Sequence, residues 1–379
     1  MTPTSLAPSA RTTAGGTFVD AFDGRYYRLT HVDRLAPFLM NVVSPSDLWL
    51  FVASNGGLTA GRVNSEHALF PYQTVDRLYD SAGTIGPFTA LRVAQPGGDV
   101  LWEPFAEHTP HLQLVRRNLY KSIEGDRVWF EEINLGLGLA FRYGWATAES
   151  HGFVRRCQLE NLSDQPCPVR LVDGLRHLLP PGIPSRLQNE SSCLTDAYKT
   201  AELLPGTSLA VYSLAAGIID RAIPLEALRA SAVWSEGLPG ADILLSDVQL
   251  PAFHAGESVT GETHRRGIRA TYALAAALTL APRARQDWVM VADTDLTQTD
   301  IVARRHELAC GGLPEAALRA TAESTRRLRG LVGLADGVQL GGDERITVHH
   351  FANVLFNLMR GGVFPDGHAM PGPAFAAFV

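Results

Sequence analysis

The sequence lacks the short motifs that mark the common catalytic folds. Its 379 residues contain no GxSxG nucleophile elbow, no GxxxxGK[ST] phosphate loop and no HExxH metal-binding helix. The glycine pair nearest to a dinucleotide fingerprint, Gly136 and Gly138, lies in an extended-looking stretch instead of before a helix. The local sequence therefore points to no serine hydrolase elbow, no nucleotide loop and no zinc protease helix.

Cysteine and net positive charge are also scarce. The four cysteines (Cys157, Cys167, Cys193 and Cys310) show no CxxC spacing and have no adjacent His pair, so we predict neither a zinc site nor a disulfide scaffold. The chain has 33 Lys and Arg against 39 Asp and Glu, a formal net charge of −6, and no basic run. We therefore expect no nucleic-acid partner, no metal, no cofactor and a reducing, cytoplasmic location.

Long hydrophobic runs are missing as well. Residues 1–16 are rich in Thr, Ala, Ser and Pro and contain no apolar stretch of the length found in secretory signals. No run approaches the ~18 apolar residues that a membrane-spanning helix needs. The most apolar window, residues 272–281, is too short to cross a bilayer and is predicted to be a buried strand. We expect no membrane association.

The chain does have many short segments of β character, within a composition that is 46% hydrophobic. Residues 47–53 and 58–63 flank the sequence Ser54-Asn55-Gly56-Gly57, and Asn-Gly between two such segments predicts a hairpin because both residues tolerate positive φ. Further strands are predicted at residues 87–93, 100–105, 112–120, 127–134, 137–146, 152–160, 168–174, 209–213, 243–249, 271–280 and 286–292. So many antiparallel-looking strands require two large packed sheets.

The pattern changes to helix after residue 293. Ser, Thr and Asp residues lead into a predicted helix at 301–309, Pro314 starts a second one over 315–331, and residues 349–360 form a third with glycines at its end. The third helix has a long apolar stripe and no later helix to cover it. We expect it either to dock on the β part or to belong to a longer helical domain.

One polar loop follows the predicted hairpin and concentrates the side chains suited to a sugar ligand. Carboxylate, amide, guanidinium and aromatic groups are the mixture that hydrogen-bonds sugar hydroxyls and packs on a sugar ring. The candidate carbohydrate-binding residues are Arg62, Asn64, Glu66, Tyr72, Asp76 and Arg77. The alternative is an ordinary polar surface loop in which Asp76 and Arg77 form ion pairs with their neighbours.

The order of these segments resembles a known family. Pro37-Phe38-Leu39-Met40-Asn41, the 52–60 hairpin with its polar loop, and Val100-Leu101-Trp102-Glu103-Pro104-Phe105 are similar to the N-terminal region of cellobiose phosphorylase-like enzymes. The strand at 153–164 with its Asn-Leu-Ser-Asp turn, and the late strand at 273–282, are similar to later pieces of the same region. The resemblance covers residues 25–360 and rests on short segments in a shared order.

The resemblance implies a mainly β fold: a galactose-mutarotase-like super-sandwich, an α-helical linker and the first helix of an (α/α)6 barrel. The expected divisions are a flexible leader at 1–20, the sandwich at 21–293, the linker at 294–342 and an incomplete barrel at 343–379. Because the family's general acid lies in the barrel, the resemblance places no catalytic residue in this chain. It also implies an oligosaccharide substrate, a missing C-terminal barrel domain as partner, and a homodimer.

The resemblance leaves the reaction open between phosphorolysis, with inorganic phosphate as co-substrate, hydrolysis and glycosyl transfer, on β-linked glucan-type oligosaccharides. The polar loop lacks the arginine-rich segment associated with the phosphorylases. Two alternatives remain. One is a stand-alone aldose 1-epimerase, in which His177 and Glu262 would serve as acid and base, although residues 175–179 are typical of a core or edge strand. The other is a non-catalytic carbohydrate-binding module.

Overall fold

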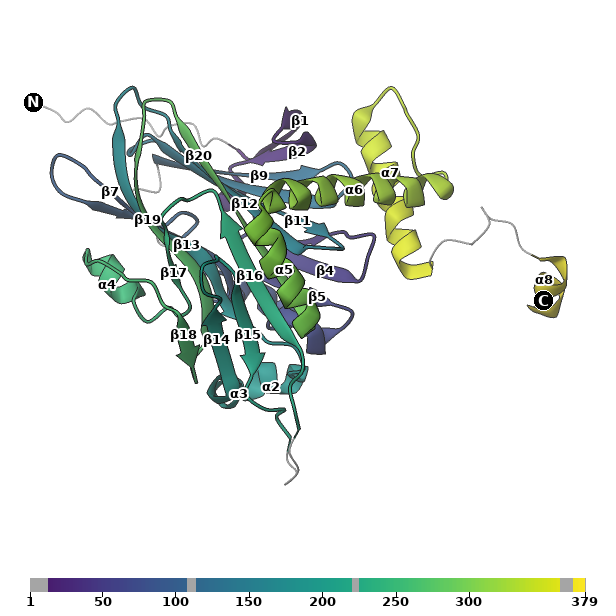
Figure 1. Cartoon of the computed structure of the whole chain (residues 1–379). Helices are drawn as coiled ribbons and strands as arrows, with labels where there is room; N and C mark the ends of the chain where they lie inside the picture. The colour runs from purple at the N-terminus through teal and green to yellow at the C-terminus, as the bar shows by residue number, and fades with distance from the viewer. Residues whose placement is uncertain (1–12, 108–113, 220–224, 362–370, 379) are drawn as a thin grey trace, which may run out of the picture.

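The computed structural model describes residues 13–107, 114–219, 225–361 and 371–378, except the side chains of Val75, Asp76 and Phe378. Its centre is three antiparallel sheets (Figure 1). The eleven-stranded sheet runs in the order β1 (Gly15–Ala21), β2 (Gly24–Thr30), β9 (Val115–Ser122), β10 (Arg127–Asn134), β11 (Leu139–Ala148), β12 (Gly152–Asn161), β20 (Arg285–Leu296), β16 (Ala230–Glu236), β15 (Ala210–Leu214), β14 (Lys199–Leu203) and β18 (His264–Arg266).

Two smaller sheets face the large one. The five-stranded sheet runs in the order β17 (Asp242–Leu244), β19 (Ala270–Leu280), β13 (Cys167–Leu178), β7 (Gly86–Val93) and β8 (Val100–Trp102). The four-stranded sheet is a meander of β3 (Leu39–Val42), β4 (Leu48–Ala53), β5 (Leu58–Arg62) and β6 (Ala68–Phe70). The predicted hairpin is confirmed, because β4 pairs with β5 around Asn55 and Gly56, and Gly56 has φ +92°.

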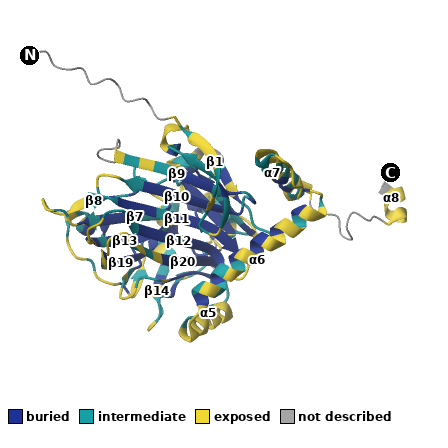
Figure 2. Cartoon of the chain, turned by 90° about the horizontal axis from the view of Figure 1, so that it is seen from above, coloured by how far each residue is buried: buried dark blue, intermediate teal, exposed yellow. Residues whose placement is uncertain are grey.

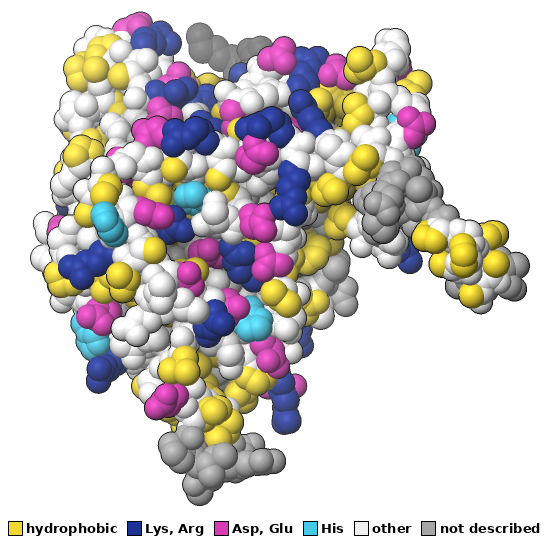
Figure 3. All heavy atoms as spheres, turned by 45° about the vertical axis from the view of Figure 1, so that its right-hand side comes forward, with side chains coloured by type: hydrophobic (Ala, Val, Ile, Leu, Met, Phe, Trp, Pro, Cys, Tyr) yellow, Lys and Arg dark blue, Asp and Glu magenta, His cyan; other side chains and the backbone are white. Residues whose placement is uncertain are grey.

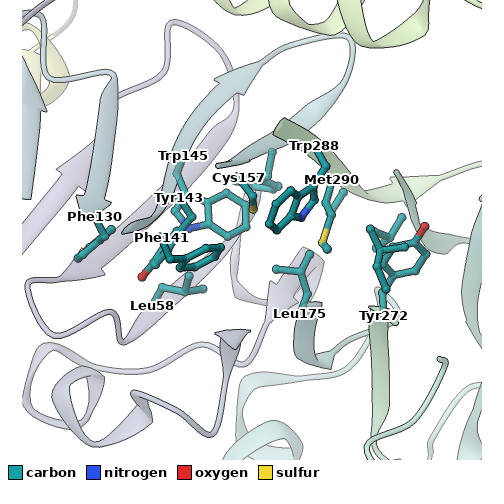
Figure 4. Packing of buried hydrophobic residues seen from close by; sticks show 14 of the residues in the cluster. Leu58, Phe130, Phe141, Tyr143, Trp145, Cys157, Leu175, Tyr272, Trp288 and Met290 are labelled. Carbon is teal, nitrogen blue, oxygen red and sulfur yellow. The ribbon is translucent and has the colours of Figure 1, made fainter. Parts of the chain in front are cut away.

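A single large hydrophobic cluster fills the space between the sheets. It includes aromatic side chains from β10, β11 and β20, which pack against leucines of β5 and β13 (Figure 4). The buried residues labelled there are Leu58, Phe130, Phe141, Tyr143, Trp145, Cys157, Leu175, Tyr272, Trp288 and Met290. The predicted mainly β sandwich is therefore present, since the inner faces of the sheets share one core.

The outer face of the large sheet is covered by helices in its centre. Helix α5 (Gln298–Cys310) and helix α6 (Leu313–Leu334) lie across it, and Leu313 and Ala317 pack on Val154, Trp234 and Val291 (Figure 2). Both faces of β11, β12 and β20 are covered at this point. Successive side chains of these strands are therefore nearly all buried and do not alternate between buried and exposed.

The third predicted helix is α7 (Glu344–Gly361), and it packs on α6. Phe351 and Leu355 contact Leu328 and Val332 in a small hydrophobic cluster. The Arg25 guanidinium on β2 donates to both carboxylate oxygens of Glu344, at 2.7 and 2.8 Å, and so ties α7 to the sandwich. The expectation that this helix docks on the β part was wrong for its apolar stripe, which packs on α6, and the ion pair with Arg25 is its contact with β2. Its membership of a helical barrel stays a prediction.

Several shorter elements were not predicted. Strand β1 begins at Gly15, so the expected leader at 1–20 is too long, and residues 1–12 lie outside the described part. The strand predicted at 243–249 was wrong beyond Leu244, because a turn there leads into helix α4 (Leu250–Ala255) with Pro251 in its first turn. Helices α1 (Val75–Leu78), α2 (Ser185–Glu190), α3 (Ser192–Tyr198) and α8 (Gly372–Phe378) complete the α-helices of the described residues.

A buried ion pair joins the two larger sheets inside the core. Arg155 on β12 donates two hydrogen bonds of 2.8 Å to Asp173 on β13, and both side chains are fully buried. Trp288 of β20 and Thr89 of β7 each donate to the same carboxylate at 2.7 Å. Burial alone would lower the pKa of Arg155, but the charge and hydrogen bonds of Asp173 outweigh this effect and raise it.

We expect Asp173→Asn to lower the free energy of unfolding by about 3–5 kcal/mol, because it leaves the Arg155 charge buried without a counter-charge. Urea unfolding followed by tryptophan fluorescence measures the change. The matched control is Asp164→Asn, which removes the partner of Arg283 in an exposed ion pair and should change the free energy of unfolding little. Equal losses in the two variants would contradict the assignment of Asp173 as the central link.

Candidate functional site

Arg62, the first of the predicted ligand residues, lies at the end of β5 within a charged junction. Its Nε and Nη2 donate to the two carboxylate oxygens of Asp293 on β20, at 2.8 and 3.1 Å. Its Nη1 donates to Asp47 at 2.7 Å and its Nη2 to the backbone oxygen of Glu149, also at 2.7 Å. One guanidinium therefore links the small sheet, the large sheet and the turn between β11 and β12.

Asp293 is the buried end of this junction. Its side chain is only 10% exposed, and it also accepts a hydrogen bond of 2.9 Å from the Thr294 amide. Burial raises the pKa of Asp293 even though the Arg62 guanidinium acts in the opposite direction. Without Arg62 this carboxyl would be buried and unpaired, so the pair has a structural function at this position.

A second charged group lies beside the first. His67, which ends the 3-10 turn at Ser65–His67, faces Asp295 with 3.7 Å between Nε2 and Oδ1. Arg229 donates to the backbone oxygen of Asp295 at 3.0 Å and lies 3.8 Å from its carboxylate. Asp295 has a left-handed backbone with φ +62°, a conformation that costs free energy for a residue with a side chain. The His67 Nδ1 is buried and has no hydrogen-bond partner.

The predicted polar loop is interrupted by strand β6 (Ala68–Phe70), and its part from Asn64 to Gln73 is held against helix α2. The Gln188 side chain accepts from the Tyr72 amide at 2.8 Å and donates to the Ser65 backbone oxygen at 2.7 Å. Asn189 donates to the Tyr72 oxygen at 3.0 Å and accepts from Gln73 at 2.9 Å. Because side chains of one helix bind both ends of the loop, its backbone is fixed before any ligand arrives.

An aromatic group lies next to this loop. The rings of Trp49 and Tyr72 meet edge to face with 5.7 Å between their centres, and Phe51 lies 6.1 Å from Trp49. Tyr72 is 38% exposed, and the other two are partly exposed. The Trp49 indole nitrogen is buried without a partner. The arrangement provides apolar ring surface beside polar side chains, the combination that carbohydrate binding requires.

The other predicted ligand residues are distributed over the same loop and the helix after it. The Asn64 side chain accepts from the Glu66 amide at 2.9 Å and caps the 3-10 turn, while the Glu66 side chain is exposed. Arg77 is exposed on α1. The side chain of Asp76 lies outside the described ones. Glu66, Tyr72 and Arg77 are thus all exposed, and Arg62 lies in the charged junction. The turn that carries Glu66 follows the Arg62 end of β5, whereas α1 lies beside the Asn55–Gly57 end.

The epimerase alternative requires His177 and Glu262 to face each other. His177 has φ +59° and lies where the register between β13 and β19 shifts. The positive charges of Lys199 and Arg269 act on its imidazole. The Glu262 carboxylate accepts from the Leu245 amide, Ser246, Gln249 and Arg265 at 2.7–3.0 Å. Glu262 therefore has a structural role. The expectation that 175–179 belongs to a strand is confirmed as far as Leu178, the end of β13.

Sequence reasoning missed His67, Arg229 and Asp295. His67 stood inside the polar loop, but its partner Asp295 is more than two hundred positions later in the chain, and no local spacing links the two. The two aspartates Asp293 and Asp295, on either side of Thr294 near the end of a strand, were the available signal.

The described residues contain no group of three or more His, Cys, Asp or Glu side chains that could hold a metal ion. All four cysteines are free, with Cys157 and Cys167 buried. Within the described ranges no helix combines the length and apolar character needed to cross a bilayer. Acidic and basic side chains are intermingled on the face shown in Figure 3, which carries no extended patch of one sign.

No protein-family model matches the chain, and no curated protein matches its sequence. Solved structures with a similar arrangement include a bacterial glucoamylase complexed with acarbose, with 8% identity, a TM-score of 0.43, and 79% of this chain aligned to 39% of that one. A putative aldose 1-epimerase from Klebsiella pneumoniae has 9% identity, a TM-score of 0.38, and 78% of this chain aligned to 91% of that one.

A putative kojibiose phosphorylase from the human microbiome has 10% identity and a TM-score of 0.38, with 90% of this chain aligned to 38% of that one. The chain thus spans about two fifths of the glucoamylase and the phosphorylase and most of the epimerase. These likenesses are distant, with identities of 8–10%.

We expect Arg62→Gln to reduce the free energy of unfolding by about 2–4 kcal/mol, because Asp293 loses its counter-charge while staying buried. Arg77→Gln is the matched control, and it should change stability by less than about 0.5 kcal/mol since Arg77 is exposed. Urea unfolding of both variants tests the distinction. A stability loss confined to Arg77→Gln would show that the junction is not a structural link.

Stability should also depend on pH through His177. Burial, with the charges of Lys199 and Arg269, lowers the pKa of His177 to about 3. The His177 side chain therefore binds a proton more tightly in the unfolded chain than in the folded one. The free energy of unfolding should be highest above about pH 6.5 and should fall on acidification toward pH 3, by at most about 1.4 kcal/mol per pH unit. Burial and Arg304 lower the pKa of His151 to about 4, which acts in the same direction.

His177→Asn should flatten the decline in urea midpoint between pH 6.5 and 4, because Asn accepts the left-handed backbone and does not titrate. His264→Asn, a change at an exposed position of β18, should leave the slope as it is in the parent protein. A slope that is the same in all three proteins would mean that His177 does not control this dependence.

Proposed function

We propose that this chain is the carbohydrate-binding sandwich and helical linker of a glycoside phosphorylase or glycoside hydrolase-like enzyme acting on β-linked glucan-type oligosaccharides. The observation that carries the proposal is the fixed polar loop next to the aromatic side chains Trp49, Phe51 and Tyr72. The general acid of the reaction lies outside this chain, and an oligosaccharide is the ligand of the loop. The protein of which it forms part is cytoplasmic.

The chemistry of the loop suits a neutral sugar. The rings of Tyr72 and Trp49 offer apolar surface for the C–H face of a pyranose, and Glu66 and Arg77 offer an acceptor and a set of donors for its hydroxyls. Gln188 and Asn189 hold the loop in place before binding, so little conformational entropy is lost when the ligand orders the remaining side chains.

The charged junction supports the loop from below. Arg62 fixes the end of β5 to β20, and the neighbouring His67 and Asp295 lie at the start of the loop and at the end of β20. In this proposal Arg62 positions the loop, while Glu66, Tyr72 and Arg77 touch the sugar. Asn64 shapes the 3-10 turn that presents Glu66.

The helices point to a larger helical domain. Helix α7 buries Phe351 and Leu355 on α6 but leaves Ile346, Phe356 and Met359 more than half exposed. An apolar helical face of this kind is normally covered by other helices. We propose that α7 opens an (α/α)6 barrel that supplies the catalytic carboxyl, with inorganic phosphate as co-substrate in the case of phosphorolysis, in a homodimeric enzyme.

The test is calorimetric titration with β-linked gluco-oligosaccharides. Tyr72→Ala should weaken binding by about 5- to 30-fold, equivalent to about 1–2 kcal/mol, because the exposed ring of the platform is removed. Tyr72→Phe should retain most of the affinity, since it keeps the ring. Phe356→Ala, an exposed aromatic on α7, is the matched control and should bind as the parent does.

Absence of binding in the parent chain, or equal weakening by Tyr72→Ala and Phe356→Ala, would overturn the proposal. An NMR measurement of glucose anomerisation separates the epimerase alternative, which predicts a rate above that of buffer. A rate that exceeds buffer and is lost in Glu262→Gln would replace the binding role with epimerase chemistry.

A further inference from the structure

A hollow of about 350 Å³ lies on the outer face of the five-stranded sheet, the face on which α4 packs. This volume is within the range of pockets that hold small ligands. Its lining is mostly small or apolar, with two arginines and one aspartate at its rim. The lining residues are Arg92, Ala94, Asp99, Pro168, Val169, Arg170, Ala277, Leu278 and Thr279.

The two arginines are direct neighbours. Arg92 on β7 and Arg170 on β13 are register partners in the antiparallel ladder, and Ala277 on β19 is the next partner across the sheet. Like charges directly opposite each other on one face of a sheet are destabilising. The pair therefore needs negative charge close by, and the structure shows what supplies it.

Two backbone oxygens and one carboxylate stabilise the pair. Arg92 donates to the His254 oxygen at 2.7 Å and Arg170 to the Gly256 oxygen at 3.1 Å, both at the C-terminal end of α4. Arg170 Nη2 also donates to Asp99 Oδ2 at 3.0 Å, and Arg92 Nε lies 3.6 Å from the same oxygen. The Arg92 Nε is buried and has no hydrogen-bond partner.

Asp99 lies at the end of the turn between β7 and β8. It follows Gly97 and Gly98, whose positions have open space around them, and Gly98 has φ +115°. Its side chain is about one third exposed, as is that of Arg170. Glycines give the turn conformational freedom. The Asp99 carboxylate can therefore leave the guanidinium groups without disturbing the sheet below.

We propose that this hollow is a binding site for a sugar carboxylate, and that Asp99 occupies the position of the ligand's acidic group when the site is empty. Guanidinium groups match the planar geometry of a carboxylate and hold it through paired hydrogen bonds. The floor of Ala94, Pro168, Ala277 and Thr279 receives the body of the ligand. A uronic acid residue combines these two features in one ring.

Saturation-transfer NMR titrations of the full chain with methyl β-glucuronide test the assignment. Asp99→Ala should tighten binding about fivefold or more, because the internal competitor is gone. Arg170→Gln should weaken it about tenfold or more. Arg283→Gln, which removes another exposed arginine of an Asp pair, is the matched control and should leave affinity unchanged.

Two further probes identify the ligand class. Methyl β-glucoside should not compete with the glucuronide, and inorganic phosphate should compete only weakly. The assignment is overturned if Asp99→Ala binds glucuronide no more tightly than the parent, if the glucoside competes equally, or if phosphate binds and glucuronide does not. Binding of neutral oligosaccharide that depends on Tyr72 is unaffected by each of these results, so this site and the proposed function fail separately.

Discussion

The sandwich depends on the hydrogen bonds that protein side chains donate to one buried carboxylate, that of Asp173. Asp173 lies in the middle of β13, between the two larger sheets, and accepts hydrogen bonds from Arg155, Trp288 and Thr89. These donors come from β12, β20 and β7, so one group fixes the separation and register of strands in both sheets. A buried carboxylate without these partners would carry a free-energy cost that few domains tolerate.

The same principle sets the position of the helices. The turn between β9 and β10 carries Glu124 and Asp126, both buried, and they accept from Arg329 and Thr325 of α6. Apolar contacts of Leu313 and Ala317 cover the sheet at the other end of the same helix. Helix α6 is thus held by hydrophobic contacts at one end and by polar contacts at the other. Helix α7 is positioned by α6, on which it packs Phe351 and Leu355.

Local signals were enough for much of the fold. Gly56 favours the hairpin because few other residues adopt its positive φ, and β4 and β5 pair on either side of this turn. The apolar window at 272–281 and the stripe at 349–360 likewise became β19 and α7, since their periodicity does not depend on distant residues. Strands β1 and β2 were not predicted because their side chains are mostly exposed or half-buried and form no apolar run, and each strand is stabilised mainly by its partner.

The candidate site was likewise predictable only in part from local sequence. The sequence by itself placed carboxylate, guanidinium and tyrosine side chains in one loop after a hairpin, because residue type and turn chemistry are local properties. Only the tertiary structure decided that Arg62 forms an ion pair with Asp293, 231 positions away, and that Glu66 and Tyr72 are exposed at the surface. It also decided that Arg155 and Asp173 are internal and that Arg92 and Arg170 share a face of the sheet. Charged residues read alike in a sequence, and burial and pairing across strands determine whether each one stabilises the fold or is free to bind.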